Sequence, residues 1–288
     1  MTVDESRVAQ RGVDADGLPS AAFRPLIETT VTVLTWNVWH RFGPWERRWR
    51  TISRTLRHCR PDVVTLQEVP GSSQAEVLAS ELGMHLGYCP YANALGLETG
   101  FAVLSQWPID GTASAALPVA AGAEQEWGRS VFMARIAGPR GVIPVFTTHL
   151  SYTPEASALR IAQLTAVGEF VRQHPSPNFP PILTGDFNAD PASDEVRMVV
   201  GRTAMPPGMT AMVDVWDMAG DGSGATWSND NPWARLALET SRRIDYIFVG
   251  RPFQGGAGHP VAARLEGVVP HEEVVGSDHY AVCAQLRY

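Results

Sequence analysis

The densest set of reactive side chains in this chain is Gly185-Asp186-Phe187-Asn188-Ala189-Asp190, which follows the apolar run Pro181-Ile182-Leu183. This order predicts a buried strand that delivers two carboxylates and a carboxamide into a tight turn. Sites in α/β sheets frequently form at the carboxyl ends of strands. Other apolar segments end in, or contain, a residue of the same kind: Asn37, Glu68, His149, Asp245 and Asp278-His279.

Each of these polar residues has an ordinary explanation when it is taken singly. Asn37 and Asn188 are residue types that cap turns. Glu68 could face solvent, and His149 could be a hydrogen-bonded core histidine. Asp245 lies inside an apolar strand, where a carboxylate is costly unless it is paired or hydrogen-bonded. Their recurrence at six segments, without a competing cysteine or glycine-rich site, indicates one shared site.

The residue types indicate metal-assisted hydrolysis of a phosphate ester. The oxygen donors Glu68, Asn37 and Asp278 suit a hard divalent cation, most naturally Mg²⁺ with Mn²⁺ as a substitute, whereas the two isolated histidines make zinc a poorer fit. Such an ion polarises a phosphoryl oxygen and stabilises the leaving group. An aspartate and an asparagine on one turn can align water and hold phosphate, and a histidine beside an aspartate can offset developing negative charge.

Length and composition favour one large domain over residues 29–288, preceded by a flexible N-terminal arm over residues 1–28. The chain has 288 residues, of which 44% are hydrophobic, and a net charge of −7. This charge argues against a general DNA-coating protein, which normally carries a basic face. The three scattered cysteines argue against a disulfide framework or a zinc cluster. Without a signal-peptide pattern or a membrane-length apolar stretch, we expect a cytoplasmic location.

Strands and helices alternate early in the chain, and strands dominate later. Strand patterns cover residues 30–38, 62–69, 101–104, 131–134, 142–150, 182–184, 244–249 and 280–286, and helical periodicity covers 155–173. After Pro44, an apolar stripe of Trp45, Trp49, Ile52 and Leu56 predicts another helix. We expect the arginines of this helix, Arg48 included, to form a solvated face, with phosphate steering as the alternative. The pattern favours an α/β fold of layers with mixed sheets.

Six short motifs, in this order, resemble those of the endonuclease/exonuclease/phosphatase superfamily, which has the deoxyribonuclease I-like fold. The resemblance extends from about residue 31 to the end of the chain. It implies a four-layer α/β sandwich in which two mixed β-sheets pack face to face with helices outside. The motifs are Thr35-Trp36-Asn37-Val38, Leu66-Gln67-Glu68-Val69, Thr148-His149-Leu150, Gly185-Asp186-Phe187-Asn188-Ala189-Asp190, Arg243-Ile244-Asp245-Tyr246-Ile247 and Ser277-Asp278-His279-Tyr280.

The resemblance also implies roles for individual residues. Glu68 would contact the metal, with support from Asn37 and Asp278. Asp186 would orient or deprotonate the attacking water, and Asn188 would hold the phosphate. Asp190, in the same turn, is expected only to cap the segment that follows it.

The remaining roles implied by the resemblance concern the histidines and the pocket walls. His279 would bind the scissile phosphate, with Asp245 fixing its imidazole. His149 matches the second histidine of the deoxyribonuclease, sphingomyelinase and deadenylase branches, and Glu98 is expected to pair with it, with an exposed glutamate as the alternative. Arg129 would contact phosphate, with a surface ion pair as the alternative. Trp227 would stack on a base or an apolar head group, with plain packing as the alternative.

The sequence therefore predicts a Mg²⁺-dependent hydrolase of a phosphodiester that acts by in-line attack of water. Nucleic acid, a nucleotide, and a phospholipid or sphingomyelin head group are all open as substrates, and no protein partner is predicted. A phosphomonoesterase of the phosphoinositide type is the alternative. A non-catalytic binding module and a hydrolase of non-phosphate esters are less favoured.

Overall fold

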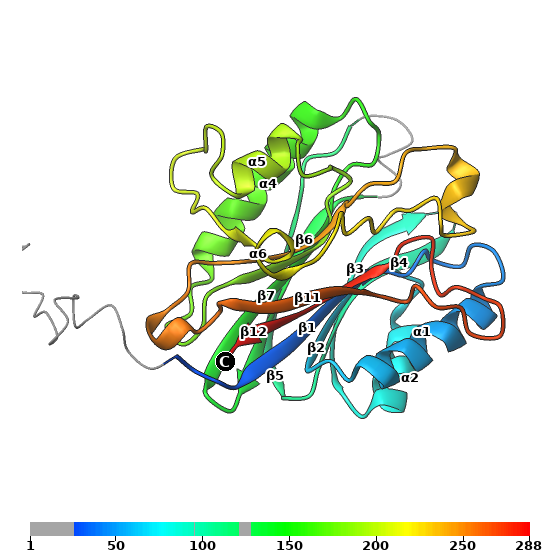
Figure 1. The fold of residues 1–288 in the computed structure, drawn as a ribbon, viewed down its shortest axis with the longest axis horizontal. Coiled ribbons are helices and arrows are strands. Elements are labelled where there is room, and N and C mark those ends of the chain that lie inside the picture. The colour runs from blue at the N-terminus through cyan, green and yellow to red at the C-terminus, as the bar shows by residue number, and fades with distance from the viewer. Residues whose placement is uncertain (1–25, 95, 121–127) are drawn as a thin grey trace, which may run out of the picture.

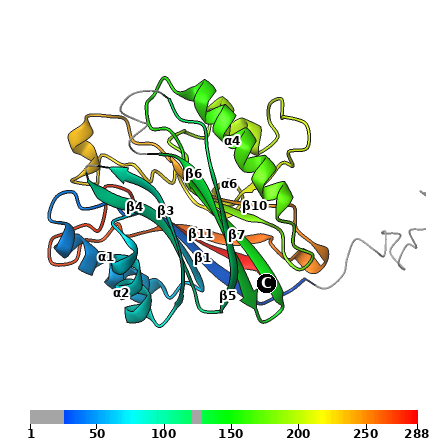
Figure 2. The same cartoon turned by 180° about the vertical axis from the view of Figure 1, so that it is seen from behind.

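Two β-sheets packed face to face form the centre of the protein, and helices cover both outer faces (Figure 1). The structure is a computed structural model and describes residues 26–94, 96–120 and 128–288. Figures 1 and 2 show α1 and α2 on one side of the sandwich and α4 on the other. This arrangement confirms the predicted four-layer α/β sandwich. The predicted N-terminal arm lies outside the described residues except for residues 26–28, and its boundary stays a prediction.

The first sheet has the strand order β11-β12-β1-β2-β4-β3. Its β1 pairs in parallel with β2 and antiparallel with β12, which makes the sheet mixed. Buried residues of its outer face pack against α1 (Trp45–Cys59) and α2 (Ser72–Leu82). Its strands are β1 (Thr30–Asn37), β2 (Val63–Val69), β3 (His85–Ala94), β4 (Leu97–Ser105), β11 (Pro260–Glu266) and β12 (Ala281–Arg287).

The second sheet has the strand order β5-β6-β7-β8-β10-β9 and is also mixed. Its outer face packs against α4 (Ser157–Gln173) and the short helix α5 (Asp194–Val199). The helix α6 (Val215–Ala219) follows β9 and caps the sandwich. The strands are β5 (Ile109–Ala116), β6 (Ser130–Gly138), β7 (Gly141–His149), β8 (Ile182–Asp186), β9 (Val213–Asp214) and β10 (Asp245–Val249).

The structure contains elements that the sequence patterns did not reveal. Strand β3 contains Gly87 and Pro90, which disfavour a strand interior, and after Ile109 and Asp110 the strand β5 holds only small residues and threonine. Strand β11 and helix α2 were also missed. No helix in the described part of the chain is both long and apolar enough to cross a membrane.

The inner faces of the sheets change from apolar to polar along the strands. Successive side chains of a strand point to opposite faces, so Val31 and Val33 of β1 join the core between the sheets, and Leu34 and Trp36 pack under α1. The inner-face positions that follow the valines hold a buried polar layer, and the last positions hold the predicted site. That layer consists of Thr35, Thr65, Gln67, Thr147 and Thr184.

Hydrogen bonds in the polar layer join the two sheets directly below the site. The Gln67 amide of β2 donates to the hydroxyl groups of Thr35 at 3.1 Å and Thr147 at 3.0 Å. The Thr65 and Thr184 hydroxyl groups lie 2.8 Å apart across the same interface. Because these hydrogen bonds are directional, the layer specifies how the ends of β1 and β2 meet the ends of β7 and β8.

Candidate active site

Strand register places three of the predicted residues side by side at one edge of the second sheet. His149 ends β7 and Asp186 ends β8, and the two are partners in a parallel register. Asp245 begins β10 and is the antiparallel partner of Asp186. The close approach of β8 to β7 requires Gly185, because a Cβ there would lie 2.0 Å from the Thr148 carbonyl oxygen.

The first sheet contributes Asn37 from the end of β1 and Glu68 from β2. By simple alternation Glu68 would point away from the inner face, since Leu66 packs under the helices. Glu68 instead adopts a left-handed φ of 56°, and the register of β2 with β4 shifts between Leu66 and Val69. Such an irregularity redirects a side chain and is costly for a residue that is not glycine. It turns the Glu68 carboxylate into the site.

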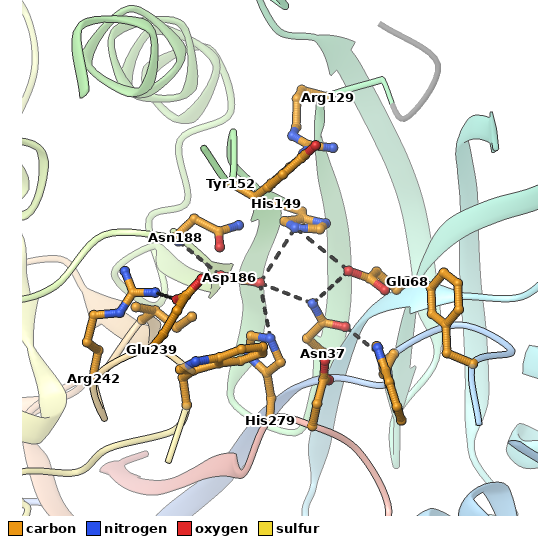
Figure 3. A pocket seen from close by; sticks show the side chains of 15 residues that line it. Asn37, Glu68, Arg129, His149, Tyr152, Asp186, Asn188, Glu239, Arg242 and His279 are labelled. Atoms are coloured by element: carbon orange, nitrogen blue, oxygen red, sulfur yellow. Dashed lines mark hydrogen bonds and ion pairs between the residues drawn. The ribbon is translucent and has the colours of Figure 1, made fainter. Parts of the chain in front are cut away.

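Asp186 lies at the centre of the pocket (Figure 3). Its Oδ2 accepts a hydrogen bond from Asn37 Nδ2 at 3.0 Å and lies 3.5 Å from His149 Nε2. The same oxygen lies 3.8 Å from His279 Nε2, and Oδ1 accepts from the backbone N–H of Asn188 at 2.9 Å. Burial, together with the neighbouring Asp245 carboxylate, raises the pKa of Asp186 to about 6. Asp186 can therefore take up a proton near neutral pH.

His279 and Asp245 form a buried pair. The Asp245 Oδ2 atom lies 2.8 Å from His279 Nδ1, which leaves Nε2 directed toward Asp186. Burial lowers the pKa of His279, but the carboxylates of Asp245 and Asp186 outweigh it and raise the pKa well above its usual range. At neutral pH the imidazole is therefore a cation. A cation at this position can offset the charge that develops on a phosphoryl oxygen.

Two loops hold this pair in place. The Ser277 hydroxyl accepts from the backbone N–H of His279 at 3.2 Å and donates to the Asn37 carbonyl oxygen at 2.7 Å. The Thr226 hydroxyl accepts from the backbone N–H of Asp245 at 3.2 Å. The sequence analysis did not single out Ser277 and Thr226 as positioning residues. The sequence gives little indication of this role, because serine and threonine are common next to polar residues in any loop.

Glu68 and Asp278 lie close together in the lining of the pocket, and their two carboxylates form what we call the acidic wall. Burial raises the pKa of Glu68, and burial with the Glu68 carboxylate nearby raises the pKa of Asp278 to about 7. Asn37 Nδ2 donates to Glu68 at 3.0 Å and so connects this wall to Asp186. The neutral imidazole of His149 lies 3.9 Å from Glu68 and does not balance its charge. His279 is a nearby cation, but it contacts Asp245, so two largely buried carboxylates remain that fit a divalent cation.

A second set of possible ligand atoms belongs to Asp186, Asp245 and His279, and these atoms lie within 4.8 Å of one another. The short Asp245–His279 contact and the raised pKa of His279 make this imidazole a proton donor. Metal ligation requires a neutral imidazole. The acidic wall of Glu68 and Asp278 is therefore the better place for a metal.

His149 is buried and neutral. Burial, followed by the positive charges of Arg129 and His279, lowers its pKa well below the usual range. Its Nδ1 lies 3.4 Å from the hydroxyl group of Tyr91, a residue that the sequence analysis missed. The predicted partner of His149, Glu98, does not reach it.

Glu98 is a correction to the sequence analysis, and strand alternation explains it. Phe101 and Val103 of β4 face the core between the sheets, so Glu98 lies on the opposite face, toward α2. Its Oε1 accepts from the hydroxyl group of Tyr88 at 3.0 Å and from the backbone N–H of Ser72 at 3.3 Å. The structure thus gives Glu98 a place outside the site.

Asn188 and Asp190 occupy different places in the turn after β8. Asn188 has a left-handed φ of 49° and lines the pocket, where its Nδ2 donates to the Leu150 carbonyl oxygen at 3.1 Å. Asp190 instead accepts from the backbone N–H of Ala192 at 3.0 Å, and its carbonyl oxygen accepts from Ser193, the N-cap of α5. Asp190 therefore stabilises the turn before α5, but Ser193 and not Asp190 caps that helix.

The side chains together line a pocket of about 390 Å³. Arg129 lines one wall with Tyr152, whose ring lies 5.9 Å from the guanidinium carbon. Trp227 lines the opposite wall, edge-on to His279 with ring centroids 5.1 Å apart. Among the predicted residues, Asp245 and Glu98 are absent from the lining, and Asp245 acts through His279. The remaining lining residues are Asn37, Trp39, Phe42, Glu68, His149, Asp186, Asn188, Glu239, Arg242, Ile244, Asp278 and His279.

Arg48 is a second correction, because it is buried and not part of a solvated face. Only 1% of Arg48 is exposed, and its guanidinium donates five hydrogen bonds to backbone carbonyl oxygens. The acceptors belong to the loop after β1 and to the loop before Asp278. Burial lowers the pKa of Arg48 to about 10, so it stays charged at neutral pH. Arg48 thus joins the two loops that carry Asn37 and Asp278.

The carboxylates, the carboxamides and the cationic imidazole at the ends of two facing mixed sheets form a site whose chemistry suits hydrolysis of a phosphoric ester. The sequence profile of the Endonuclease/Exonuclease/phosphatase family matches residues 34–279. The chain therefore belongs to this family, as the motifs predicted.

Individual relatives agree with this assignment. A neutral sphingomyelinase-like protein of Drosophila melanogaster is 26% identical over 279 residues, which cover 89% of this chain and 60% of that protein. The Drosophila melanogaster protein angel is 27% identical over 278 residues, which cover 85% of this chain and 73% of that protein. The chain thus spans less than two thirds of the sphingomyelinase-like relative.

Solved structures show the same fold. Truncated TDP2 of Caenorhabditis elegans superposes with a TM-score of 0.68 at 20% identity, over 91% of this chain and 99% of that chain. An endonuclease/exonuclease/phosphatase of Beutenbergia cavernae superposes with a TM-score of 0.62 at 25% identity, over 90% of this chain and 71% of that chain.

Proposed function

We propose that the protein is a Mg²⁺-dependent phosphodiesterase that cleaves its substrate by in-line attack of water. The position of Asp186 carries this proposal, because its Oδ2 faces Asn37, His149 and His279 at 3.0, 3.5 and 3.8 Å. The Asp186 carboxylate therefore shares the Asn37 amide with Glu68 of the acidic wall. It also lies near the neutral imidazole of His149 and the cationic imidazole of His279. This suits a base that takes a proton from water beside a bound phosphate.

Glu68 and Asp278, with Asn37 behind them, would hold the cation. Oxygen ligands of this kind suit Mg²⁺, and Mn²⁺ is a reasonable substitute. When bound, the ion would supply a Lewis acid that polarises a phosphoryl oxygen and stabilises the leaving group.

The protein side chains would bind the phosphate and accept the proton of the attacking water. Asp186 would accept the proton of the attacking water, and Asn188 would position a phosphoryl oxygen. His279 would donate from Nε2 to another phosphoryl oxygen, since Asp245 occupies Nδ1. His149, held neutral by burial, would offer a further hydrogen bond without adding charge.

The charge of the site favours a diester over a monoester. Glu68, Asp186, Asp245 and Asp278 all lie in or beside the pocket and are buried or nearly so. A monoester carries up to two negative charges and a diester one, so a diester is repelled less by these carboxylates. A phosphomonoesterase stays the second candidate, and a bound cation would be needed to offset its substrate.

The relatives leave two classes of diester open. One relative bears the name of a sphingomyelinase, which points to a phospholipid head group. TDP2 of Danio rerio has been solved in complex with a single-strand DNA product, and it superposes with a TM-score of 0.70 at 21% identity. We infer a small or single-stranded substrate, because a net charge of −7 disfavours long duplex DNA.

Hydrolysis of bis(p-nitrophenyl) phosphate tests the proposal. We expect activity that requires added Mg²⁺ or Mn²⁺, is abolished by a chelator, and falls by a factor of about 10² to 10⁴ in Asp186→Asn and His279→Gln. Asp190→Asn is the matched control, because Asp190 lies in the same turn and its contact to Ala192 survives in asparagine. Wild-type rates in Asp186→Asn or in the chelated protein would refute the mechanism.

We also propose that residues 29–288 form the catalytic domain and that the protein acts in the cytoplasm. A variant that lacks residues 1–28 should keep the diesterase activity of the full chain. Cell fractionation should recover the protein with cytoplasmic markers.

A further inference from the structure

An ion pair lines the pocket on the side of Asp186 away from Glu68 (Figure 3). It joins the guanidinium of Arg242 to the carboxylate of Glu239, three residues earlier. The side chains are 27% and 42% exposed, so both reach solvent. The Nε of Arg242 is buried and has no hydrogen-bond partner among the described residues. Arg242 thus lines the pocket with a guanidinium whose hydrogen-bonding capacity Glu239 satisfies only in part.

Backbone pairing connects Arg242 to the catalytic histidine. Arg242 and Trp227 exchange two backbone hydrogen bonds of 3.0 and 2.8 Å, and Trp227 also forms a β-bridge with His279. Three neighbouring backbones therefore carry His279, Trp227 and Arg242 in that order. At about 4.8 Å between neighbours, Arg242 begins roughly 10 Å from His279. Because His279 is proposed to bind the scissile phosphate, Arg242 lies beside that phosphate and does not contact it directly.

We propose that Arg242 binds a second phosphate of the substrate, next to the scissile one, and that Glu239 occupies the guanidinium until substrate arrives. The inference rests on the proposed phosphodiesterase function and names its substrate class: a nucleotide or a short single-stranded oligonucleotide. Trp227, between the two phosphate positions, offers a surface on which a base can stack.

The exposure of the ion pair supports this exchange of partners. Ion pairs between solvent-exposed side chains contribute little to stability, so displacing Glu239 costs little. A phosphate accepts two parallel hydrogen bonds from a guanidinium, and this geometry is stronger than a screened contact with one carboxylate. A choline head group would instead bring a cation, which would select Glu239 and repel Arg242.

The test compares substrates that differ by one phosphate. Dithymidine monophosphate (TpT) has only the scissile phosphate, and pTpT and TpTp each add one at an end. We expect wild-type protein to prefer pTpT or TpTp over TpT in kcat/KM, and Arg242→Gln to lower this preference at least about tenfold. Glu239→Gln should raise the preference and lower KM for the two-phosphate substrate, because the competing carboxylate is gone.

Controls separate this inference from general effects. Arg172 and Glu169 on α4 form an exposed ion pair with the same three-residue spacing, so Arg172→Gln and Glu169→Gln should leave the preference unchanged. An unchanged preference in Arg242→Gln would overturn the inference. So would a Glu239→Gln protein that loses hydrolysis of p-nitrophenylphosphorylcholine without any gain on pTpT. Hydrolysis of bis(p-nitrophenyl) phosphate serves as the reference: its absence in wild-type protein refutes the phosphodiesterase function itself.

Discussion

Replacing Asp245 with asparagine should shift the pH range in which the enzyme works. Asp245 holds His279 by a 2.8 Å contact and is the strongest of the charges that keep this imidazole protonated. Asparagine has nearly the same shape but no charge. Two unit charges 4 Å apart at an effective dielectric constant of about 20 interact by about 4 kcal/mol. At 1.36 kcal/mol per pKa unit this corresponds to about 3 units, the upper end of the usual 1 to 3.

The sign of the shift follows from the role of His279. A histidine whose pKa is raised in the folded protein is charged at low pH and loses its charge as the pH rises through that raised pKa. Activity that needs the imidazolium therefore falls on the alkaline side of the profile. In Asp245→Asn this alkaline limb should move to lower pH by about 1 to 3 units. The acidic limb, which Asp186 sets, should also move to lower pH, because the Asp245 carboxylate no longer raises the pKa of Asp186.

The assay is the pH dependence of kcat/KM for bis(p-nitrophenyl) phosphate with saturating Mg²⁺. Asp62→Asn is the matched control, because Asp62 is a half-buried carboxylate far from the pocket that accepts from the backbone N–H of Thr32 at 2.7 Å. Its alkaline limb should coincide with that of the wild type. An Asp245→Asn profile with an unmoved alkaline limb would refute the assignment of His279 as the cationic group.

Two further predictions concern the acidic wall and the loops that hold it. Because the pKa values of Asp278 and Asp186 are raised to about 7 and about 6, the folded metal-free protein binds more protons than the unfolded chain, and its stability should fall as the pH rises from about 4 to 7. Added Mn²⁺ should therefore raise the melting temperature more at pH 8 than at pH 5.5, with little effect in Glu68→Gln; an equal gain at both pH values would contradict the metal assignment. Arg48→Met should lower the free energy of unfolding by about 3 kcal/mol or more, because five carbonyl groups, three of them in fully buried contacts, lose their donor. Exposed Arg50→Met should change it by less than about 0.5 kcal/mol, as urea denaturation can measure.

The helical periodicity of the sequence indicates that Arg48 is buried, whereas its charge suggests that it is exposed. Arg48 lies three residues after Trp45 and four before Ile52, so it falls on the apolar stripe that predicted α1. Residue type alone favoured solvent, since arginine is rarely buried. The acceptors that make burial favourable come from the loop after β1 and from Gly276, which is 228 residues away in the chain. Only the tertiary structure brings them together.

The alternation of strand residues likewise predicts more of the site than the motifs do separately. In β1, the inner positions Val31, Val33, Thr35 and Asn37 run from core to site, and β7 and β8 repeat the order. The antiparallel β10 runs from site to core instead, beginning at Asp245. The same rule places Glu98 outside, and it fails at Glu68, where a left-handed residue breaks the alternation. Local pattern therefore determines most site residues, but not an irregularity held by long-range packing.

The sequence by itself determined the family, most strand ends and the polar residues expected at the site, because these depend on short motifs and on a period of two residues. The tertiary structure decided the register that sets Asp186 between His149 and Asp245, the closeness of the Glu68 and Asp278 carboxylates, and the position of Arg242 beside Trp227. These depend on pairing between segments far apart in the chain. No local propensity encodes such pairing, because it arises only when the two sheets pack.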